Sequence, residues 1–594
     1  MRQASTPLMV DVDPSWNITD LVVRSATLQP DRITMRRKVD RVWRDVRAAD
    51  FRDEAVAVAK GLIALGVEPG DRVAIMSRTR YEWTLLDTAI WFAGAITVPV
   101  YETSSPDQVA WILSDSGSTA IFCETAANLE TVRTAGVESV TTSWVIDDDA
   151  VGSVVAAGAE VSDQDVEIRR RSASLDDIAT IIYTSGTTGA PKGCELTHGN
   201  FVVLTENTTA ALGDVVSRED ASTLLFLPLA HVFARFIQVL CFSCMARLSH
   251  CSDASEVVAQ LSEVQPTFVL SVPRVFEKIY NSAEQKAVTA GRGKLFRKAT
   301  DTAIAYSQAQ DASGPGIGLR VRHAVFDRLV YPKIRAVFGG HLAYAVSGGG
   351  PLGERLGHFY RGVGVQVLEG YGLTETTAPQ SVNRPGLTKI GTVGSQLPGN
   401  GVRIAEDGEI LLQGPNVFRA YHNNPQATQD AFTDGWFRTG DLGDLDDDGY
   451  LRITGRKKEI LVTAGGKNVA PAVLEDRLRS HPLVSQCVVV GDRRPYIAAL
   501  VTLDTEMLPA WAAAEGIKDL DVSAAATNPK VLAAIQSAVD EANKAVSRAE
   551  SIRRFEVLDE DFTLESGHLT PSMKLKRSVV MSDYADAVDR LYDS

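Results

Sequence analysis

The sequence is poor in cysteine and has no long apolar run that is free of charged or kinking residues. Six cysteines in 594 residues are too few for a disulfide framework and predict reduced, buried thiols. The first ten residues lack the apolar core of a secretory leader, so we expect no secretion. The apolar segment 224–248 contains Pro228, His231 and Arg235, and a central arginine alone costs about 2.5–3.5 kcal/mol on insertion into a bilayer. We therefore expect this segment to be buried inside a soluble protein.

The sequence also lacks an excess of basic residues. Its net charge of −15 argues against general binding to nucleic acid, so any site for a polyanion must be a local basic pocket. No internal repeat, low-complexity tract or Pro/Gly-rich linker stands out. Cys241, Cys244, His250 and Cys251 could ligate zinc, but no second pair follows at zinc-finger spacing. Packing in the core is the favoured interpretation of this cluster.

The order of the predicted elements indicates an α/β protein with several subdomains. Strands and amphipathic helices alternate from residue 50 to about 123 and again from 178 to about 380, which is typical of parallel sheets covered by helices. Short apolar pieces broken by Gly and Asp follow, and then a final mixed block. We expect a large N-terminal region at 1–455 and a small α+β C-terminal domain at 456–594. Within the large region we expect two stacked αβ subdomains at about 45–175 and 176–385, and a small β-barrel or curled antiparallel sheet at 386–455.

One segment differs from the rest in charge. Residues 286–335 hold ten Lys or Arg against three Asp, and the surrounding chain is acidic. Apolar positions at helical spacing within the expected helical insert 281–335 allow two interpretations. The insert is either a solvated helical pair packed on the sheet, which we favour, or a surface that lies on an anionic membrane.

A glycine- and threonine-rich stretch, TSGTTGAPKG at 184–193, follows an apolar β-branched run and is typical of a phosphate-binding loop. Its glycines allow close approach of the backbone to an anion, its hydroxyls donate hydrogen bonds, and Lys192 adds a positive charge. It is not a Walker A loop, because Pro191 stands where the second glycine belongs and Gly193 follows the lysine. The alternative is a surface turn with a chance lysine.

Three further motifs offer groups that suit a nucleotide. SGGGP at 347–351 follows a predicted strand, so its backbone can lie against a planar or anionic ligand. EGYGLTE at 369–375 offers an aromatic face in Tyr371 and oxygen ligands for Mg²⁺ in Thr374 and Glu375. Asp441 and Arg456, fifteen residues apart, could accept from ribose hydroxyls and clamp the nucleotide. Taken alone, Asp441 also fits a turn residue, and Arg456 also fits a surface ion pair.

Together these motifs resemble those of the adenylate-forming acyl-CoA synthetases. YTSGTTGAPKG (183–193), EGYGLTE (369–375), GWFRTGD (435–441) and GRKKE (455–459) occur in the family's order, and the resemblance covers nearly the whole chain. VPRVFEK (272–278), the insert after it and LTPSMKLKR (569–577) look like the bacterial long-chain fatty acid ligase branch. The resemblance implies that ATP and a fatty acid form acyl-AMP with release of pyrophosphate, and that CoA then displaces AMP.

The resemblance also implies roles for individual residues. The ATP-binding set is Thr184, Ser185, Gly186, Thr187, Thr188, Gly189 and Lys192 for the β- and γ-phosphates, Thr374 and Glu375 for Mg²⁺ and the α-phosphate, Asp441 and Arg456 for the ribose, and Gly348, Gly349, Gly350, Glu369, Gly370 and Tyr371 around the adenine. Lys574, matched by its spacing to Arg577, is the expected catalytic lysine, with Lys576 as the competing candidate. His231 matches a histidine near the reacting carboxylate, and a buried structural histidine is the alternative.

Movement of the C-terminal domain is implied as well. Lys458 occupies the hinge position about which relatives rotate this catalytic lid between half-reactions, although many of them have aspartate there. Gly466 and Lys467 would then line the pantetheine tunnel of CoA. Arg235 stands where some long-chain relatives place a gate over the acyl tunnel, and we expect it to couple ATP binding to entry of the fatty acid.

The sequence therefore predicts an ATP-dependent long-chain fatty acid–CoA ligase in the cytoplasm, with fatty acid, ATP, Mg²⁺ and CoA as partners. Peripheral contact with the inner face of the membrane through 286–335, and a monomer or a homodimer, remain open. One rival is a fatty acyl-AMP ligase that passes its product to a carrier protein. A second rival is a catalytically silent, membrane-recruited protein that binds acyl chains and nucleotide. An amino-acid adenylation module fits the long-chain-type segments less well.

Overall fold

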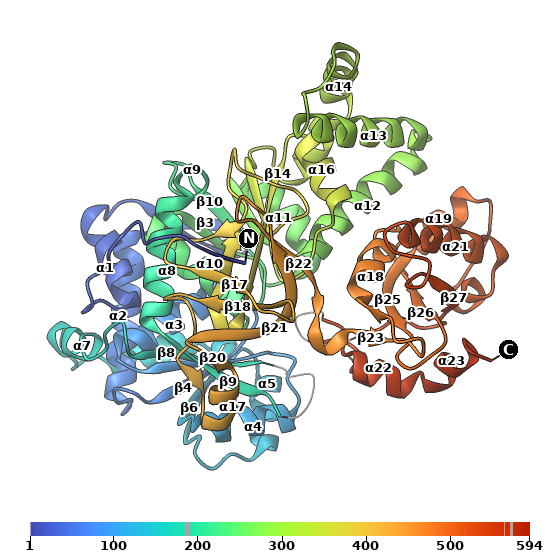
Figure 1. Cartoon of the computed structure of the whole chain (residues 1–594). Helices are drawn as coiled ribbons and strands as arrows, with labels where there is room; N and C mark the ends of the chain where they lie inside the picture. The colour runs from blue at the N-terminus through green and yellow to red at the C-terminus, as the bar shows by residue number, and fades with distance from the viewer. Residues whose placement is uncertain (1, 185–189, 564, 571–573, 594) are drawn as a thin grey trace.

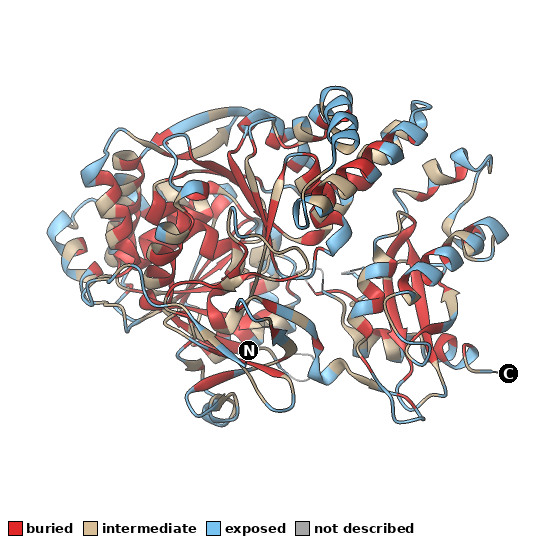
Figure 2. Cartoon of the chain, turned by 45° about the horizontal axis from the view of Figure 1, so that its top comes forward, coloured by how far each residue is buried: buried red, intermediate tan, exposed pale blue. Residues whose placement is uncertain are grey.

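The computed structural model describes residues 2–184, 190–563, 565–570 and 574–593. A larger N-terminal region and a smaller C-terminal region lie side by side (Figure 1). In both regions the buried residues concentrate in the sheets and the helix faces packed on them (Figure 2). Among the described residues, no helix is long and apolar enough to cross a membrane.

A seven-stranded sheet holds the ends of the glycine-rich stretch. Strand β8 pairs in parallel with β5 and antiparallel with β9, and Thr184 and Lys192 are register partners at the ends of β8 and β9. The pairing of β8 with β5 crosses the division expected at 175/176, because the buried edge of β5 offers backbone partners to the next apolar strand. In spatial order the strands are β19 (Ala420–Tyr421), β9 (Lys192–Thr197), β8 (Ile178–Thr184), β5 (Ile96–Val100), β4 (Arg72–Met76), β6 (Ala120–Cys123) and β7 (Thr142–Val145).

Two further sheets complete the α/β part of the N-terminal region. In the five-stranded sheet, β12, β13 and β14 are parallel, as the alternating pattern predicts, whereas β15 and β16 pair antiparallel. Its strands are β12 (Phe268–Ser271), β13 (Tyr344–Ser347), β14 (Gln366–Leu373), β15 (Ala378–Val382) and β16 (Ser395–Gln396). The four-stranded sheet contains β10 (Ser222–Leu225), β11 (Arg247–His250), β2 (Ile33–Val39) and β3 (Val42–Arg47).

The Gly- and Asp-rich part of the chain forms an antiparallel sheet. Within the described residues its strands pair as an open path from β1 to β20, and β1 comes from the start of the chain. Short strands of two to ten residues, several of them joined by tight turns, produce this arrangement. The strands are β1 (Gln3–Ser5), β17 (Gly401–Ile404), β18 (Glu409–Gln413), β20 (Phe432–Thr433), β21 (Trp436–Leu445) and β22 (Leu451–Arg456).

The C-terminal region has its own hydrophobic cores. One lies on each side of a three-stranded sheet, and both are formed by residues between 469 and 591. The strands are β25 (Val484–Val490), β26 (Ile497–Leu503) and β27 (Ile552–Val557), and a short ladder of β23 (Leu461–Val462) and β24 (Asn468–Val469) precedes them. An independent core is what a separate domain requires, and we propose its boundary at residue 456.

Local signals define many of the helices. In α4, for example, Ser105 and Gln108 form a capping box, Pro106 occupies the first turn, and Gly117 ends the helix with a φ of 63°. In chain order the helices are α1 (Ile18–Leu28), α2 (Ala48–Ala64), α3 (Tyr81–Phe92), α4 (Pro106–Ser116), α5 (Ala126–Ala135), α6 (Ala150–Ala157), α7 (Asp163–Arg170), α8 (His198–Ala211), α9 (Gly213–Val216), α10 (Val232–Cys244), α11 (Val257–Val264), α12 (Pro273–Thr289), α13 (Gly293–Gln310), α14 (Ile317–Leu329), α15 (Tyr331–Val337), α16 (Glu354–Gly362), α17 (Pro425–Asp430), α18 (Pro471–Arg479), α19 (Leu508–Ala514), α20 (Val522–Ala526), α21 (Pro529–Asn543), α22 (Arg577–Asp583) and α23 (Ala585–Arg590).

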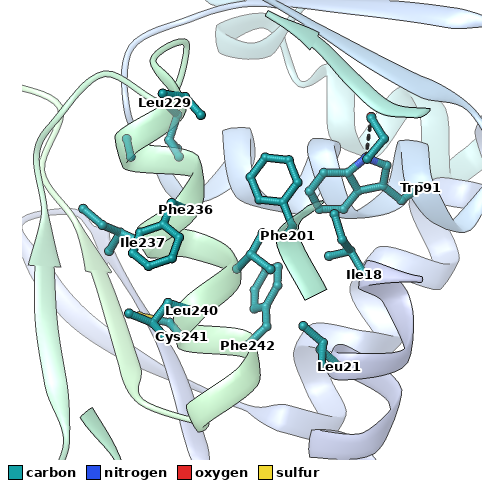
Figure 3. Close-up of a cluster of buried hydrophobic side chains, with 14 of the residues drawn as sticks. Ile18, Leu21, Trp91, Phe201, Leu229, Phe236, Ile237, Leu240, Cys241 and Phe242 are labelled. Atoms are coloured by element: carbon teal, nitrogen blue, oxygen red, sulfur yellow. Dashed lines mark hydrogen bonds between the residues drawn. The ribbon is translucent and has the colours of Figure 1, made fainter. Parts of the chain in front are cut away.

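The apolar segment 224–248 lies in the core, as expected. It forms the end of β10, all of α10 and the start of β11. Figure 3 shows Phe242 on the side of α10 that faces Phe201 and Trp91 of neighbouring helices, with Phe236, Leu240 and Cys241 on its other side. All six cysteines are free and buried, so the Cys241 and Cys244 thiols pack among apolar side chains.

Candidate active site

Residues of both regions line one cavity of 2910 Å³. Its walls come from strand ends and loops of the N-terminal region and from the segment around residue 574 of the C-terminal region. Most of the predicted site residues line it: Thr184, Lys192, His231, Gly348, Gly349, Gly350, Glu369, Gly370, Tyr371, Thr374, Glu375, Asp441, Arg456, Lys458 and Lys574. Motifs separated by almost 400 residues therefore share one site.

Asp441 is the centre of one buried polar cluster. Its Oδ2 accepts a hydrogen bond of 2.6 Å from the Tyr371 hydroxyl, and its Oδ1 lies 3.0 Å from Nε of Arg456. The strand register explains the second contact, because Asp441 and Arg456 are partners in the antiparallel pair β21–β22. Only 3% of Asp441 is exposed. Each carboxylate oxygen keeps a lone pair, so the group can still accept from ligand hydroxyls.

Glu375 belongs to a second cluster, which includes a residue that the sequence did not indicate. Thr374 and Glu375 lie in a short 3₁₀ turn after β14, and Oε1 of Glu375 accepts from the Tyr421 hydroxyl at 2.8 Å. Nζ of Lys192 lies 4.8 Å from the centre of the Tyr421 ring. Tyr421 arrives through the pairing of β19 with β9, a long-range contact of a two-residue strand that no local pattern reveals. It holds both a cation and a carboxylate in place.

The three glycines after β13 leave a flat backbone surface. Gly349 requires glycine, because its φ of 81° is one that other residues rarely adopt, whereas a Cβ at Gly348 would make only an ordinary contact of 3.4 Å with the Phe233 ring. Beside them, Oε2 of Glu369 accepts from the backbone N–H of Leu352 at 3.1 Å. Burial raises the pKa of Glu369 to about 7, and the Leu352 hydrogen bond opposes the shift only partly.

His231 stands at the N-terminus of α10 as its capping residue. Its Nδ1 accepts from the backbone N–H of Phe233 at 3.2 Å, which assigns the proton of the neutral ring to Nε2. Burial, and to a smaller extent the positive charge of Lys574, lower the pKa of His231 to about 3. The ring is therefore neutral at physiological pH and can donate a hydrogen bond into the cavity.

Lys574 enters the same site from the C-terminal region. Loss of hydration inside the cavity is the main cause that lowers the pKa of Lys574, and the positive charge of Arg456 adds to it. The negative charges of Asp441 and Glu375 oppose this shift. The groups that act on Lys574 are thus the predicted nucleotide and metal ligands. Its competitor Lys576 also lines the cavity. The adjacent Arg577 is held by Glu475 and by the carbonyl of Val489.

Arg235, the predicted gate of the acyl tunnel, forms a buried ion pair. It is absent from the cavity wall, and its fully buried guanidinium donates to Asp87 at 2.6 Å and to Thr180 at 2.7 Å. Rings of Trp83 and Trp91 lie 5.2 and 5.3 Å from it. The Arg235 side chain thus faces α3 in this arrangement, and the gate at Arg235 stays a prediction.

Other predicted residues lie outside the cavity or outside the described chain. Ser185, Gly186, Thr187, Thr188 and Gly189 lie outside the described residues. Gly466 and Lys467 do not line the cavity, and Nζ of Lys467 is 3.3 Å from Glu550. Lys458 lies in a 3₁₀ turn between β22 and β23, where the chain passes from one region to the other.

Comparisons with known proteins extend over the whole chain. A model of the AMP-binding enzyme family matches residues 22–422, and one of the AMP-binding enzyme C-terminal domain matches 458–594. A long-chain-fatty-acid–CoA ligase, FadD15, of Mycobacterium bovis is 48% identical over 604 residues, with 100% of both chains covered.

Solved structures share the fold. The adenylation domain of a Mycobacterium chelonae carboxylate reductase has a TM-score of 0.74 at 22% identity and covers 98% of this chain and 92% of its own. A fatty acyl CoA synthetase of Mycobacterium tuberculosis has a TM-score of 0.61 at 24% identity, with 96% and 99% covered. The predicted α/β fold with a large N-terminal and a smaller C-terminal domain is thus confirmed.

Proposed function

Because the chain belongs to the AMP-binding enzyme family, we propose that it is a long-chain fatty acid–CoA ligase that forms acyl-AMP and then acyl-CoA. A relative of that printed name is 48% identical over the full length of both chains. The observation that carries the proposal is the meeting of Lys574, His231, Glu375 and the Asp441–Arg456 pair in one cavity. These residues suit the attack of a negatively charged carboxylate on the phosphate chain of a nucleotide.

In the first half-reaction, a carboxylate oxygen of the fatty acid attacks the α-phosphorus of ATP, and the bond to the bridging oxygen of pyrophosphate breaks. An anion approaches a polyanion, so neutralisation of charge matters more than proton transfer. Lys574 supplies a cation next to the reacting oxygens, and neutral His231 donates from Nε2 to the carboxylate. Neither group has to change its protonation state.

The nucleotide is held by the two polar clusters. Asp441 accepts from the ribose hydroxyls through its remaining lone pairs while Arg456 and Tyr371 fix its orientation. The backbone of Gly348–Gly350 lies along the adenine face. Thr184 and Lys192, together with the hydroxyl- and glycine-rich 185–189 outside the described residues, hold the departing pyrophosphate.

Thr374 and Glu375 are the residues that would hold Mg²⁺. Tyr421 occupies one oxygen of Glu375, which leaves the other for a metal. One carboxylate and one hydroxyl suit Mg²⁺, because this ion keeps several waters and binds mainly through substrate phosphates. When bound, it would neutralise phosphate charge. Tyr421 orients Glu375 for that role.

In the second half-reaction, the CoA sulfur attacks the acyl carbon, the bond to the AMP oxygen breaks, and the thiol proton leaves. We assign Lys458 as the hinge that lets the C-terminal domain turn between the two steps. Gly466 and Lys467, now outside the cavity, would then reach the pantetheine arm.

Pyrophosphate exchange into ATP, measured over a series of fatty acids with and without CoA, tests the function. We expect exchange that depends on long-chain fatty acid and not on CoA, and acyl-CoA product only when CoA is added. Exchange without acyl-CoA formation would favour an acyl-AMP ligase that uses a carrier protein. Absence of exchange would favour a silent binding protein.

A further inference from the structure

The helical insert carries an exposed apolar stripe on its outermost helix. Helix α14 lies at the outer tip of the insert, beyond α13 (Figure 1). Four of its side chains, spaced by four residues, are exposed: Ile317 (82%), Val321 (62%), Val325 (49%) and Leu329 (58%). This spacing sets them along one side of the helix. Single exposed apolar residues are common on protein surfaces, but a contiguous exposed apolar stripe marks an interaction surface.

The opposite face of α14 is firmly anchored. The Nε2 of His323 donates to the carbonyl of Gly362 at 2.7 Å, and the His323 ring stacks on Tyr306 at 3.8 Å. Phe326 is buried, with its ring 6.3 Å from that of Tyr331. The stripe is therefore displayed on a packed helix and is not a consequence of fraying.

The stripe lies among uncompensated positive charges. Arg320, Arg322 and Arg328 of α14 are exposed, and none of them forms a salt bridge with any residue that the structure describes. Two of the three aspartates in 286–335 are already paired: Asp327 with Arg335 at 2.7 Å, and Asp311 with Arg361. A local excess of free cations on a chain of net charge −15 calls for an anionic partner.

We propose that α14 docks on an anionic membrane surface, with the apolar stripe at the boundary between headgroups and acyl chains and the arginines on lipid phosphates. Its thirteen residues are too few to span a bilayer, which takes about 20, but suit an amphipathic helix lying in the interface. A second copy of the chain is the weaker candidate, because a symmetric contact through α14 would set the same arginines against each other. Docking is independent of the proposed chemistry.

Co-sedimentation of the full chain with vesicles tests the proposal. We expect binding to vesicles of phosphatidylcholine mixed with phosphatidylglycerol and roughly tenfold or greater loss of binding with phosphatidylcholine alone. V321D/V325D and R320E/R328E should each weaken binding to the mixed vesicles roughly tenfold or more. Matched controls are Ile168→Asp, also 62% exposed, and Arg133→Glu, 68% exposed, which should bind like the unchanged chain.

Pyrophosphate exchange by each variant in detergent-free buffer without vesicles checks that it is folded. Equal binding to both vesicle types, absence of binding, or equal loss in the controls would overturn the proposal. Sedimentation velocity distinguishes the other occupant: a dimer that V321D/V325D converts to a monomer would assign the stripe to self-association and also overturn it.

Discussion

At the scale of single residues, the site depends on cations and carboxylates that share a desolvated cavity. Lys574 is the only predicted catalytic group contributed by the C-terminal domain, and its pKa responds to Arg456, Asp441 and Glu375. Its position therefore reports whether that domain is docked. In the proposed mechanism this cation acts when negative charge builds up on the α-phosphate, which happens only in the first half-reaction.

Lys574→Ala should lower the rate of acyl-AMP formation roughly a hundredfold or more, because one preorganised charge next to the developing phosphoryl charge is lost. Thioester formation from supplied acyl-AMP should change little. Single-turnover assays of the two half-reactions measure this, with Lys576→Ala as the matched control. Equal losses in both half-reactions, or a larger effect in the control, would contradict the assignment.

Glu369 should make stability depend on pH. Its folded pKa of about 7 lies above the unsheltered value of 4.5, so between these values the folded chain holds a proton that the unfolded chain releases. The free energy of unfolding contributed by this group is complete below 4.5 and is lost as pH rises through about 7. Glu369→Gln keeps a neutral side chain, so the free energy of unfolding should fall less steeply between pH 4.5 and about 7.

Urea denaturation of both proteins at several pH values in that window measures the slope. Glu130→Gln is the control, because its carboxylate is 71% exposed, and it should leave the slope unchanged. An equally steep decline in Glu369→Gln would contradict the burial of a neutral Glu369.

At the scale of elements, strand register and helix faces decide what the sequence can predict. EGYGLTE occupies the second half of β14 and the turn after it, and SGGGP starts at the last residue of β13. Both strands have clear local patterns, and Asp441 meets Arg456 through a neighbouring antiparallel strand. Such short-range geometry is readable from spacing. The surroundings of Arg235 could not be predicted from the local pattern, because its countercharge Asp87 lies in α3, 148 residues earlier in the chain. Tyr421 could not be found, since its position depends on long-range pairing of two-residue β19.

The packing of α10 against α3 gives a prediction about stability. Asp87→Asn leaves the fully buried Arg235 without its countercharge, so it should cost about 3–5 kcal/mol of unfolding free energy. The exposed pair Arg47–Asp50 is the control, and Asp50→Asn should cost about 0–1 kcal/mol. Denaturant midpoints compare the two variants. Equal small shifts would mean that the buried pair contributes little.

At the scale of the whole molecule, α12 connects the N-terminal region to the C-terminal domain in the arrangement that brings Lys574 into the cavity. Arg274 of α12 lies 3.1 Å from Asp504, which precedes α19, and Lys278 lies 2.9 Å from Glu506. The first pair is the more sheltered, with 36% and 15% of its side chains exposed, against 63% and 69% for the second. Screening by water therefore leaves more of the attraction in Arg274–Asp504.

Arg274→Gln should slow acyl-AMP formation a few-fold, since a weakened contact lowers the population in which Lys574 faces the nucleotide. Thioester formation from supplied acyl-AMP should be unchanged or faster, because the proposed second arrangement no longer competes with this contact. Lys278→Gln is the matched control, and its exposed pair should matter less. Single-turnover rates of each half-reaction measure these effects. Parallel slowing of both steps would mean that Arg274 acts on the site itself. Opposite responses would identify the α12 contact as part of the equilibrium between the two arrangements.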